Sequence, residues 1–242
     1  MKQFKLFKQQ ASVYFFAGLL LATGCTKVNG DGPIVNETRT VSSFSGIRYS
    51  LQGNLHIEPG TENSVEIRAQ QNIINVIETY VSNNTLQVRL RDNTVIHSYE
   101  PIEIHIKTSD PATIQLDGSG NIWVPNTIKP SMLTLESSGS GSIQLENLET
   151  AKLYARISGS GKIEVLHGTA GTERIKVSGS GHVLMGGILA DSVYTQTSGS
   201  GQISVWANRY LESEISGSGT VRYKGSPTVR KRVSGSGDVL PW

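Results

Sequence analysis

The sequence predicts an all-β fold, a single-stranded parallel β-helix (β-solenoid) with coils of about 20 residues. Ser-Gly-Ser-Gly occurs six times between Ser138 and Gly237, and a variant copy begins at Asp117. The copies recur every 18 to 21 residues. The residues four and six positions after the first glycine of each copy are apolar, except Pro241. The residues three and five positions after it share no chemistry, so each copy is followed by a strand with one buried face.

Each first glycine is predicted to be a structural corner, because a sharp turn with positive φ costs least at glycine. A second short strand precedes each corner, as in Leu153–Ile157, and a variable loop completes the coil. Most parallel crossovers are right-handed, and the same hand is expected here. The corner glycines are Gly118, Gly139, Gly159, Gly179, Gly199, Gly217 and Gly235.

Residues 1–24 are predicted to be a lipoprotein signal peptide. Three lysines precede an apolar run at residues 11–22, which is too short to cross the hydrocarbon core as a helix. Cys25, the only cysteine, follows this run as in a bacterial lipobox, although Ala22 stands where leucine is usual. We expect signal peptidase to cut before Cys25 and its thiol to be acylated. Cleavage at another position and an uncleaved anchor are the alternatives.

After the signal peptide, the chain divides into a tether and one domain. Residues 25–40 are polar with glycine and proline, which is typical of a flexible tether. Residues 41–242 form the domain, with irregular N-terminal coils at 41–112 and the Ser-Gly-Ser-Gly repeats at 113–242. Leu55 and Ile57 follow Gly53 with the repeat's spacing, so this segment is a candidate diverged copy. The spacing of apolar residues over 71–81 suits a short amphipathic helix or an irregular cap.

Four segments give the chain a resemblance to a known family. They are Phe44-Ser45-Gly46-Ile47, the segment Leu55–Gly60, the strand Leu86-Gln87-Val88, and the run of Ser-Gly-Ser-Gly-x-Ile/Val corners. Over about residues 41–242 the chain resembles the putative auto-transporter adhesin head domain, also called the head GIN domain, which is common in Bacteroidetes lipoproteins. The resemblance implies a single-chain parallel β-helix and an envelope location, and it brings no catalytic residues.

Motifs for cofactors and metals are missing from the sequence. No Ser-Gly-Ser-Gly copy has the third glycine of a dinucleotide-binding loop. Only Asp238 stands where a calcium-binding β-roll needs an aspartate in every repeat. The five histidines form no His-x-x-x-His pair, and one cysteine cannot make a thiolate metal site. We therefore expect no cofactor and no metal.

Catalysis of the kind carried by other β-helices needs carboxylates gathered on one face. The glutamates here occupy different coil positions, and Lys162 beside Arg222 forms no obvious constellation. We expect no enzyme, while a polysaccharide lyase or glycosidase site formed by neighbouring coils is the alternative. The glutamates considered are Glu146, Glu164, Glu173, Glu212 and Glu214.

Exposed aromatic side chains are the candidates for ligand contact. Trp123 is predicted to point outward, Trp206 ends a strand, and Tyr210 is close to it in sequence. Aromatic rings can stack on sugars, although such rings also cover corners and coil edges.

The sequence therefore favours a non-enzymatic cell-envelope lipoprotein, an adhesin-like binding or scaffold module at the outer membrane on its periplasmic or surface face. The expected partners are the membrane, through the lipid anchor, and a glycan or an envelope protein. The net charge of +2 includes three lysines of the signal peptide, so nucleic acid is not expected. A structural envelope module without a ligand is a third hypothesis.

Overall fold

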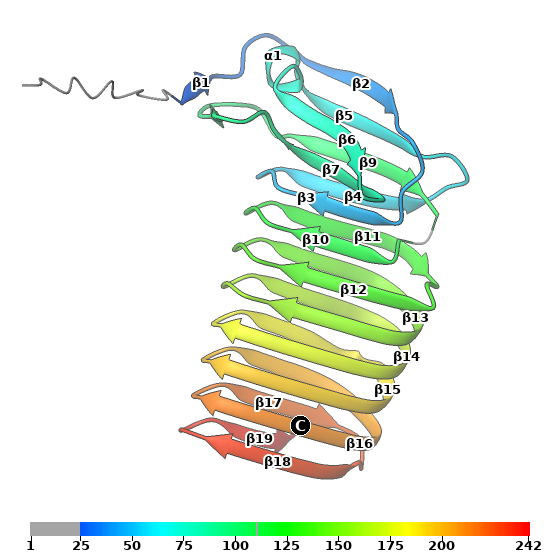
Figure 1. Cartoon of the computed structure of the whole chain (residues 1–242), viewed down its shortest axis with the longest axis vertical. Coiled ribbons are helices and arrows are strands. Elements are labelled where there is room, and N and C mark those ends of the chain that lie inside the picture. Colours follow the sequence, from blue (N-terminus) through cyan, green and yellow to red (C-terminus); the bar gives the residue numbers. More distant parts are fainter. Residues whose placement is uncertain (1–24, 110) are drawn as a thin grey trace, which may run out of the picture.

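The computed structural model describes residues 25–109 and 111–242. The chain forms a parallel β-solenoid of about six turns, with 69% of residues in strands and 2% in helix (Figure 1). The predicted fold class is therefore confirmed. In chain order the elements are β1 (Thr26–Val28), β2 (Ile34–Thr40), β3 (Gly46–Tyr49), β4 (Asn54–Pro59), β5 (Ser64–Gln70), α1 (Gln71–Ile74), β6 (Ile77–Ser82), β7 (Thr85–Leu90), β8 (Thr94–Ile96), β9 (Glu103–Thr108), β10 (Thr113–Leu116), β11 (Asn121–Ile128), β12 (Met132–Ser137), β13 (Ser142–Ile157), β14 (Lys162–Gly179), β15 (His182–Gly199), β16 (Gln202–Gly217), β17 (Thr220–Lys224), β18 (Thr228–Ser234) and β19 (Asp238–Pro241).

The solenoid has two walls. Wall 1 contains the strands that run into the corners: β7, β3, β10, β12, the later parts of β13 to β16, and β18. Wall 2 contains the strands that leave the corners: β9, β4, β11, the earlier parts of β13 to β16, β17 and β19. All these neighbours pair in parallel, so equivalent residues of successive coils lie in rows along the solenoid.

The core lies between the two walls and is built from the predicted inward positions. Ile143 and Leu145 of wall 2 are fully buried, and so are their counterparts Ile163 and Val183 in the next coils. The strands of wall 1 other than β18 bury every second residue in the same way, as Leu153 and Ile157 show. The alternation read from the sequence therefore gives the core correctly, because each strand has one face toward the lumen.

The corner glycines are required by close stacking as well as by turn geometry. Gly179, Gly199, Gly217 and Gly235 have positive φ, with 131° at Gly179. The other three corner glycines are not among the residues with positive φ. At all seven, however, an added Cβ would meet the backbone of the preceding coil. A Cβ added to Gly179, for example, would lie 2.7 Å from the carbonyl oxygen of Gly159. The corners are joined by backbone bonds such as Ser218 N–H to Gly199 O (2.9 Å).

The first coil lies before the marked repeats. β3 and β4 pair with β10 and β11, and Leu55 is aligned with Ile122. The segment around Leu55 and Ile57 thus occupies the place of a repeat, as its spacing predicted. The strands from β5 to β9 leave this coil and return to it, because β7 pairs with β3 and β9 pairs with β4.

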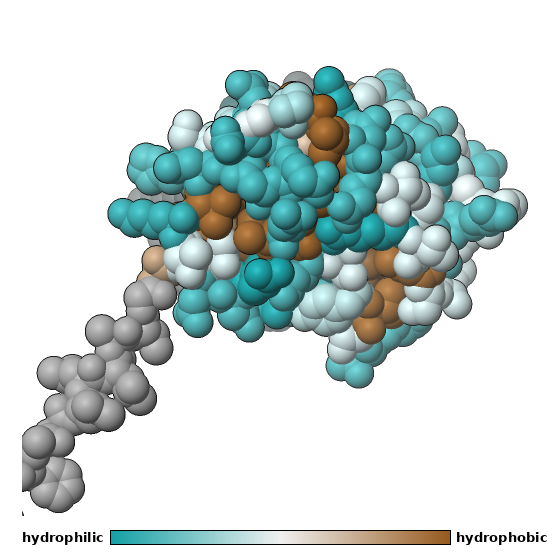
Figure 2. Space-filling model, turned by 90° about the horizontal axis from the view of Figure 1, so that it is seen from above, coloured by the Kyte–Doolittle hydropathy of each residue, from teal (hydrophilic) through white to brown (hydrophobic). Residues whose placement is uncertain are grey.

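These intervening residues close the N-terminal end of the solenoid with antiparallel strands. β5 pairs with β9 and then with β2, while β6 pairs with β7. α1 connects the two walls and buries Ile73 and Ile74, so the cap expected at 71–81 is a four-residue helix followed by a strand. Seen from this end, hydrophilic side chains cover most of the surface, and the apolar areas between them are separate (Figure 2).

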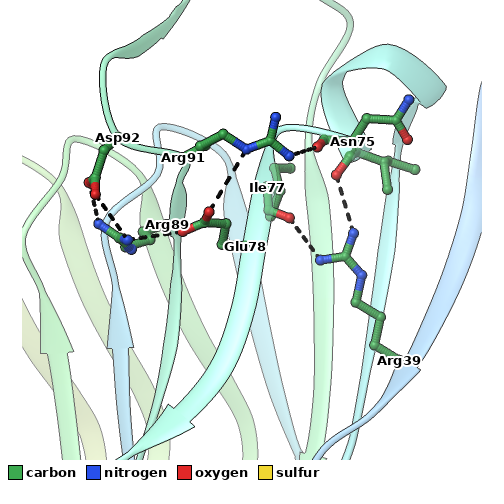
Figure 3. Close-up of polar contacts among 8 residues, drawn as sticks. Arg39, Asn75, Ile77, Glu78, Arg89, Arg91 and Asp92 are labelled. Carbon is green, nitrogen blue, oxygen red and sulfur yellow. Dashed lines mark hydrogen bonds and ion pairs between the residues drawn. The ribbon is translucent and has the colours of Figure 1, made fainter.

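Arginine side chains bind the carbonyl groups left free at the end of α1 (Figure 3). Arg39 of β2 donates to the carbonyl oxygens of Ile74 (3.2 Å) and Ile77 (2.8 Å). Arg91 donates to the carbonyl oxygen of Asn75 (2.9 Å). The cap is therefore tied to β2, which lies within the predicted tether, residues 25–40.

Residues 25–40 are not the flexible tether that their composition predicts. β1 pairs with β8, and β2 adds a full antiparallel strand to β5. The polar composition misled because β2 is an edge strand that is half-buried, with no residue fully enclosed. The predicted signal peptide, residues 1–24, lies outside the described residues.

Candidate functional site

The outer surface of wall 1 carries two rows of side chains that run along the solenoid. The first row contains the residues five positions before each corner glycine: Thr113, Thr134, Tyr154, Arg174, Tyr194, Glu212 and Arg230. The second row contains the residues three positions before it: Gln115, Glu136, Arg156, Lys176, Gln196, Glu214 and Arg232. Residues between these positions point into the core, so both rows face outward.

The two rows line a groove of about 620 Å³. Its floor and sides come from β12 to β16, and its outward lining includes Met132, Thr134, Glu136, Tyr154, Arg156, Arg174, Lys176, Tyr194, Gln196, Glu212 and Glu214. A second hollow of about 470 Å³ shares Lys176, Gln196 and Glu214 with it and reaches the corner serines. The volume is in the range of ligand pockets.

Aromatic and cationic side chains alternate in the middle of the groove. The Arg174 guanidinium lies over the Tyr194 ring, 4.5 Å from its centroid. The Tyr194 and Tyr210 rings are 5.9 Å apart and tilted against each other. Desolvation, together with the hydrogen bond to Glu212, raises the pKa of Tyr210, so its hydroxyl remains a donor.

The carboxylates of the groove are all engaged by neighbours. Glu212 accepts from the Tyr210 hydroxyl (3.1 Å) and lies 3.8 Å from Arg230. Glu214 is paired with Arg232 at 3.3 Å. Glu136 accepts a hydrogen bond from Gln115 (2.7 Å).

Three cations of the groove, unlike its carboxylates, have no partner of opposite charge among the described residues. Arg156, Arg174 and Lys176 are exposed, and within the described chain none has a carboxylate within 4.0 Å. Arg156 and Lys176 are aligned on neighbouring strands, and Arg174 is two residues before Lys176. The groove therefore has an unpaired basic centre, with paired acids toward both of its ends.

The chain matches a known protein family over most of the solenoid. The profile described as "Putative auto-transporter adhesin, head GIN domain" matches residues 43–227. The chain belongs to the head GIN domain family. The match begins just before β3 and continues through most of the Ser-Gly-Ser-Gly repeats, so it includes the whole groove.

Solved structures of similar fold come from Bacteroidetes. A putative adhesin from Bacteroides fragilis is 25% identical, with a TM-score of 0.81, covering 88% of this chain and 98% of that one. A protein from Parabacteroides distasonis named as putative lipid binding is 22% identical, with a TM-score of 0.75, covering 90% and 100%. A putative adhesin from Parabacteroides merdae is 20% identical, with a TM-score of 0.74, covering 89% and 99%. The search of curated proteins found no match.

The aromatic residues singled out in the sequence do not form one site in this head GIN domain. Trp123 lies on wall 2 near the N-terminal end, with its ring 5.7 Å from that of His56. Trp206 lies at the end of wall 2 in a later coil, aligned with Leu189. Tyr210 lies on wall 1 beside the groove. Trp123, which was predicted to point outward, is 42% exposed, and Trp206 is 37% exposed.

Sequence reasoning missed the groove because it followed the residues after each corner. The signal was present before the corners, where Tyr154, Arg174 and Tyr194 follow one another at intervals of 20 residues. Such a row predicts adjacent side chains only once the strand register is known.

Cys25, the predicted acylation site, lies on the surface. Cys25 is free and exposed at the start of the described chain, in a place where an anchor is sterically accessible. Within residues 25–109 and 111–242, no helix is long and apolar enough to cross a membrane. In the same ranges, no three His, Cys, Asp or Glu side chains are grouped to hold a metal ion.

Proposed function

We propose that this head GIN domain is the non-enzymatic binding part of a cell-envelope lipoprotein. Acylated Cys25 holds it to the outer membrane, and the groove of wall 1 contacts a glycan or an envelope protein. The family description supports the adhesin-like reading and an envelope location. The observation that carries the proposal is the groove itself, whose side chains vary while the core and corners beneath it repeat.

The groove's chemistry favours binding over hydrolysis. A glycosidase needs one carboxylic acid that keeps its proton and a second carboxylate across the scissile bond. Here both Glu212 and Glu214 are already ion-paired, with Arg230 (3.8 Å) and Arg232 (3.3 Å), so neither carboxylate is free to face a scissile bond. The rows of alternating donors, acceptors and rings suit contact along an extended chain.

A binding assay with matched double variants tests the site. Protein-coated beads are applied to a glycan array and to immobilised envelope proteins. We expect Tyr154→Ala/Tyr194→Ala to lose the binding of the wild type, and Trp123→Ala/Trp206→Ala to keep it. Both variants remove two aromatic rings, but from different walls. Loss in the tryptophan variant alone would place the site on wall 2, and release of reducing ends or unsaturated sugars would favour an enzyme.

The anchor is tested separately by fractionation. Cys25→Ser should move the protein from the membrane fraction to the soluble fraction, because it removes the acylated thiol. Unchanged membrane association of Cys25→Ser would contradict acylation at this residue.

A further inference from the structure

We propose that the groove selects an acidic polysaccharide in which charged and neutral sugars alternate. The inference rests on the proposed function of the groove and adds the chemical class of its ligand. The acid groups of the sugars bind Arg156, Arg174 and Lys176, and the neutral sugars lie over the rest of the two rows.

Arg156, Arg174 and Lys176 have no acidic partner in the groove. Other exposed cations of the solenoid have a carboxylate partner, as Arg209 has Asp191 (2.6 Å) and Lys129 has Glu149 (2.8 Å). The three cations of the basic centre have none within the part of the chain that the structure describes. Like charges on adjacent strands repel one another, and an anion that bridges them removes this repulsion.

The geometry of the basic centre suits discrete acid groups. Arg156 and Lys176 are on adjacent parallel strands, which are about 4.8 Å apart. Arg174 and Lys176 are two residues apart on one strand, about 6.6 Å along it. A carboxylate on a sugar ring fits between two such cations, and a guanidinium can bind it with two hydrogen bonds.

The acids at both ends of the groove limit the charge density of the ligand. Glu136 lies on one side of the basic centre, and Glu212 and Glu214 lie on the other. A nucleic acid carries a charge on every unit, so one of its phosphates would meet Glu136, whose polar contact in the described chain is the neutral amide of Gln115. A polymer with neutral units between its acid groups avoids that repulsion.

The lining also favours a sugar over a peptide. An extended peptide needs partners for its backbone N–H and C=O groups, which it normally finds at a strand edge. On the face of wall 1 the strands are already paired on both sides, so those groups are not available. The groove offers the hydroxyls of Thr134 and Tyr154 and the amide of Gln196, which match the hydroxyl groups of neutral sugars.

Binding of a hyaluronan hexasaccharide, which alternates uronate and neutral sugars, tests the inference. The comparison probes are chitohexaose, which is neutral, hexaglutamate, and a short oligothymidylate. By calorimetry we expect hyaluronan to bind best, with a Kd that rises with ionic strength. Arg156→Gln/Arg174→Gln/Lys176→Gln should raise that Kd at least about tenfold, since each lost contact is charge-assisted.

The matched control is Arg68→Gln/Lys107→Gln/Arg222→Gln, which removes the same charges from exposed positions outside wall 1. It should change the Kd less than about twofold at equal ionic strength, and far-UV circular dichroism should show both variants folded. An equal loss in the control would mean unspecific attraction and would overturn the inference. Binding of chitohexaose that is lost in Tyr154→Ala/Tyr194→Ala but kept in the basic-centre variant would keep the groove and refute the acidic ligand. Preference for hexaglutamate or oligothymidylate would replace the ligand class, and no binding of any probe would overturn the inference.

Discussion

The two ends of the solenoid stop the stacking of coils in different ways. At the N-terminal end, β2, β5 and β6 add antiparallel strands and α1 covers the core, with Ile73 and Ile74 buried. At the C-terminal end, β18 is exposed along its whole length, and among residues 25–109 and 111–242 it pairs with β16 alone. The N-terminal end is therefore closed by added structure, whereas the last coil at the C-terminal end is open to solvent.

Charge takes the place of a cap at the C-terminal end. Lys231 is aligned with buried Ser213 of the preceding coil, so its position faces the lumen. Its ammonium reaches Asp238 at 3.2 Å, and Arg230 and Arg232 flank it. Inward-pointing charge and edge lysines are known means of preventing strand addition. We expect these charges to protect the C-terminal end without an added layer.

The largest expected effect on stability comes from replacing a buried valine near the N-terminal end with alanine. The same substitution at an exposed valine of the C-terminal end is the comparison. Val88 of β7 is fully buried, whereas Val233 of β18 is 40% exposed. Val88→Ala should lower the free energy of unfolding by about 2–3 kcal/mol, because it removes buried methyl groups and leaves a cavity. Val233→Ala should cost less than about 1 kcal/mol. Urea unfolding of both variants measures the difference, and equal losses would contradict the contrast between the ends.

A buried carboxyl in the middle of the solenoid sharpens the contrast with Lys231. Glu173 is fully buried in wall 1, and neither of its side-chain oxygens has a hydrogen-bond partner. Desolvation raises its pKa well above 4.5, so it is protonated in the folded protein. Burial therefore removes the charge of Glu173 in the middle of the solenoid, whereas Lys231 at the C-terminal end is exposed to solvent.

The stability of the protein should fall with rising pH because of Glu173. Above pH 4.5 the unfolded chain releases this proton and the folded protein retains it, so ionisation favours unfolding. Each pH unit costs about 1.4 kcal/mol until the folded pKa is reached. Glu173→Gln should remove this slope in urea unfolding at acidic and neutral pH, while the control Glu212→Gln should keep it. A slope that persists in Glu173→Gln would assign the proton to another group.

The sequence predicts the repeated parts of this structure better than the unique ones. The inward positions such as Ile143 and Leu145, and the corner at Gly179, follow from a local pattern that every coil repeats. The cap depends on pairings that occur once, such as that of β2 with β5, and no periodicity indicates them. Arg39 binds carbonyls near residue 75 because of that pairing, so its role was not visible.

The candidate site is partly periodic and partly unique, so the sequence predicts only some of its features. The rows containing Tyr154, Arg174 and Tyr194 are periodic, and the sequence contained them. Which carboxylates are paired depends on register and side-chain reach, as for Glu214 and Arg232. The unpaired basic centre could be recognised only after those pairs were known. The signal peptide and the acylation of Cys25 remain predictions.

The smallest expected effect on stability, and the most direct test of the C-terminal end, comes from Lys231→Val. The valine would complete the row of apolar residues facing the lumen between Val229 and Val233, so the folded monomer should lose little or no stability. The open edge would then lack its inward charge, and we expect concentration-dependent self-association in analytical ultracentrifugation. Lys231→Arg, which keeps the charge, should remain in the same state as the wild type. If Lys231→Val also keeps the wild-type state, the lysine does not protect this end, and the protection must come from Arg230 and Arg232 or from the twist of the last coil.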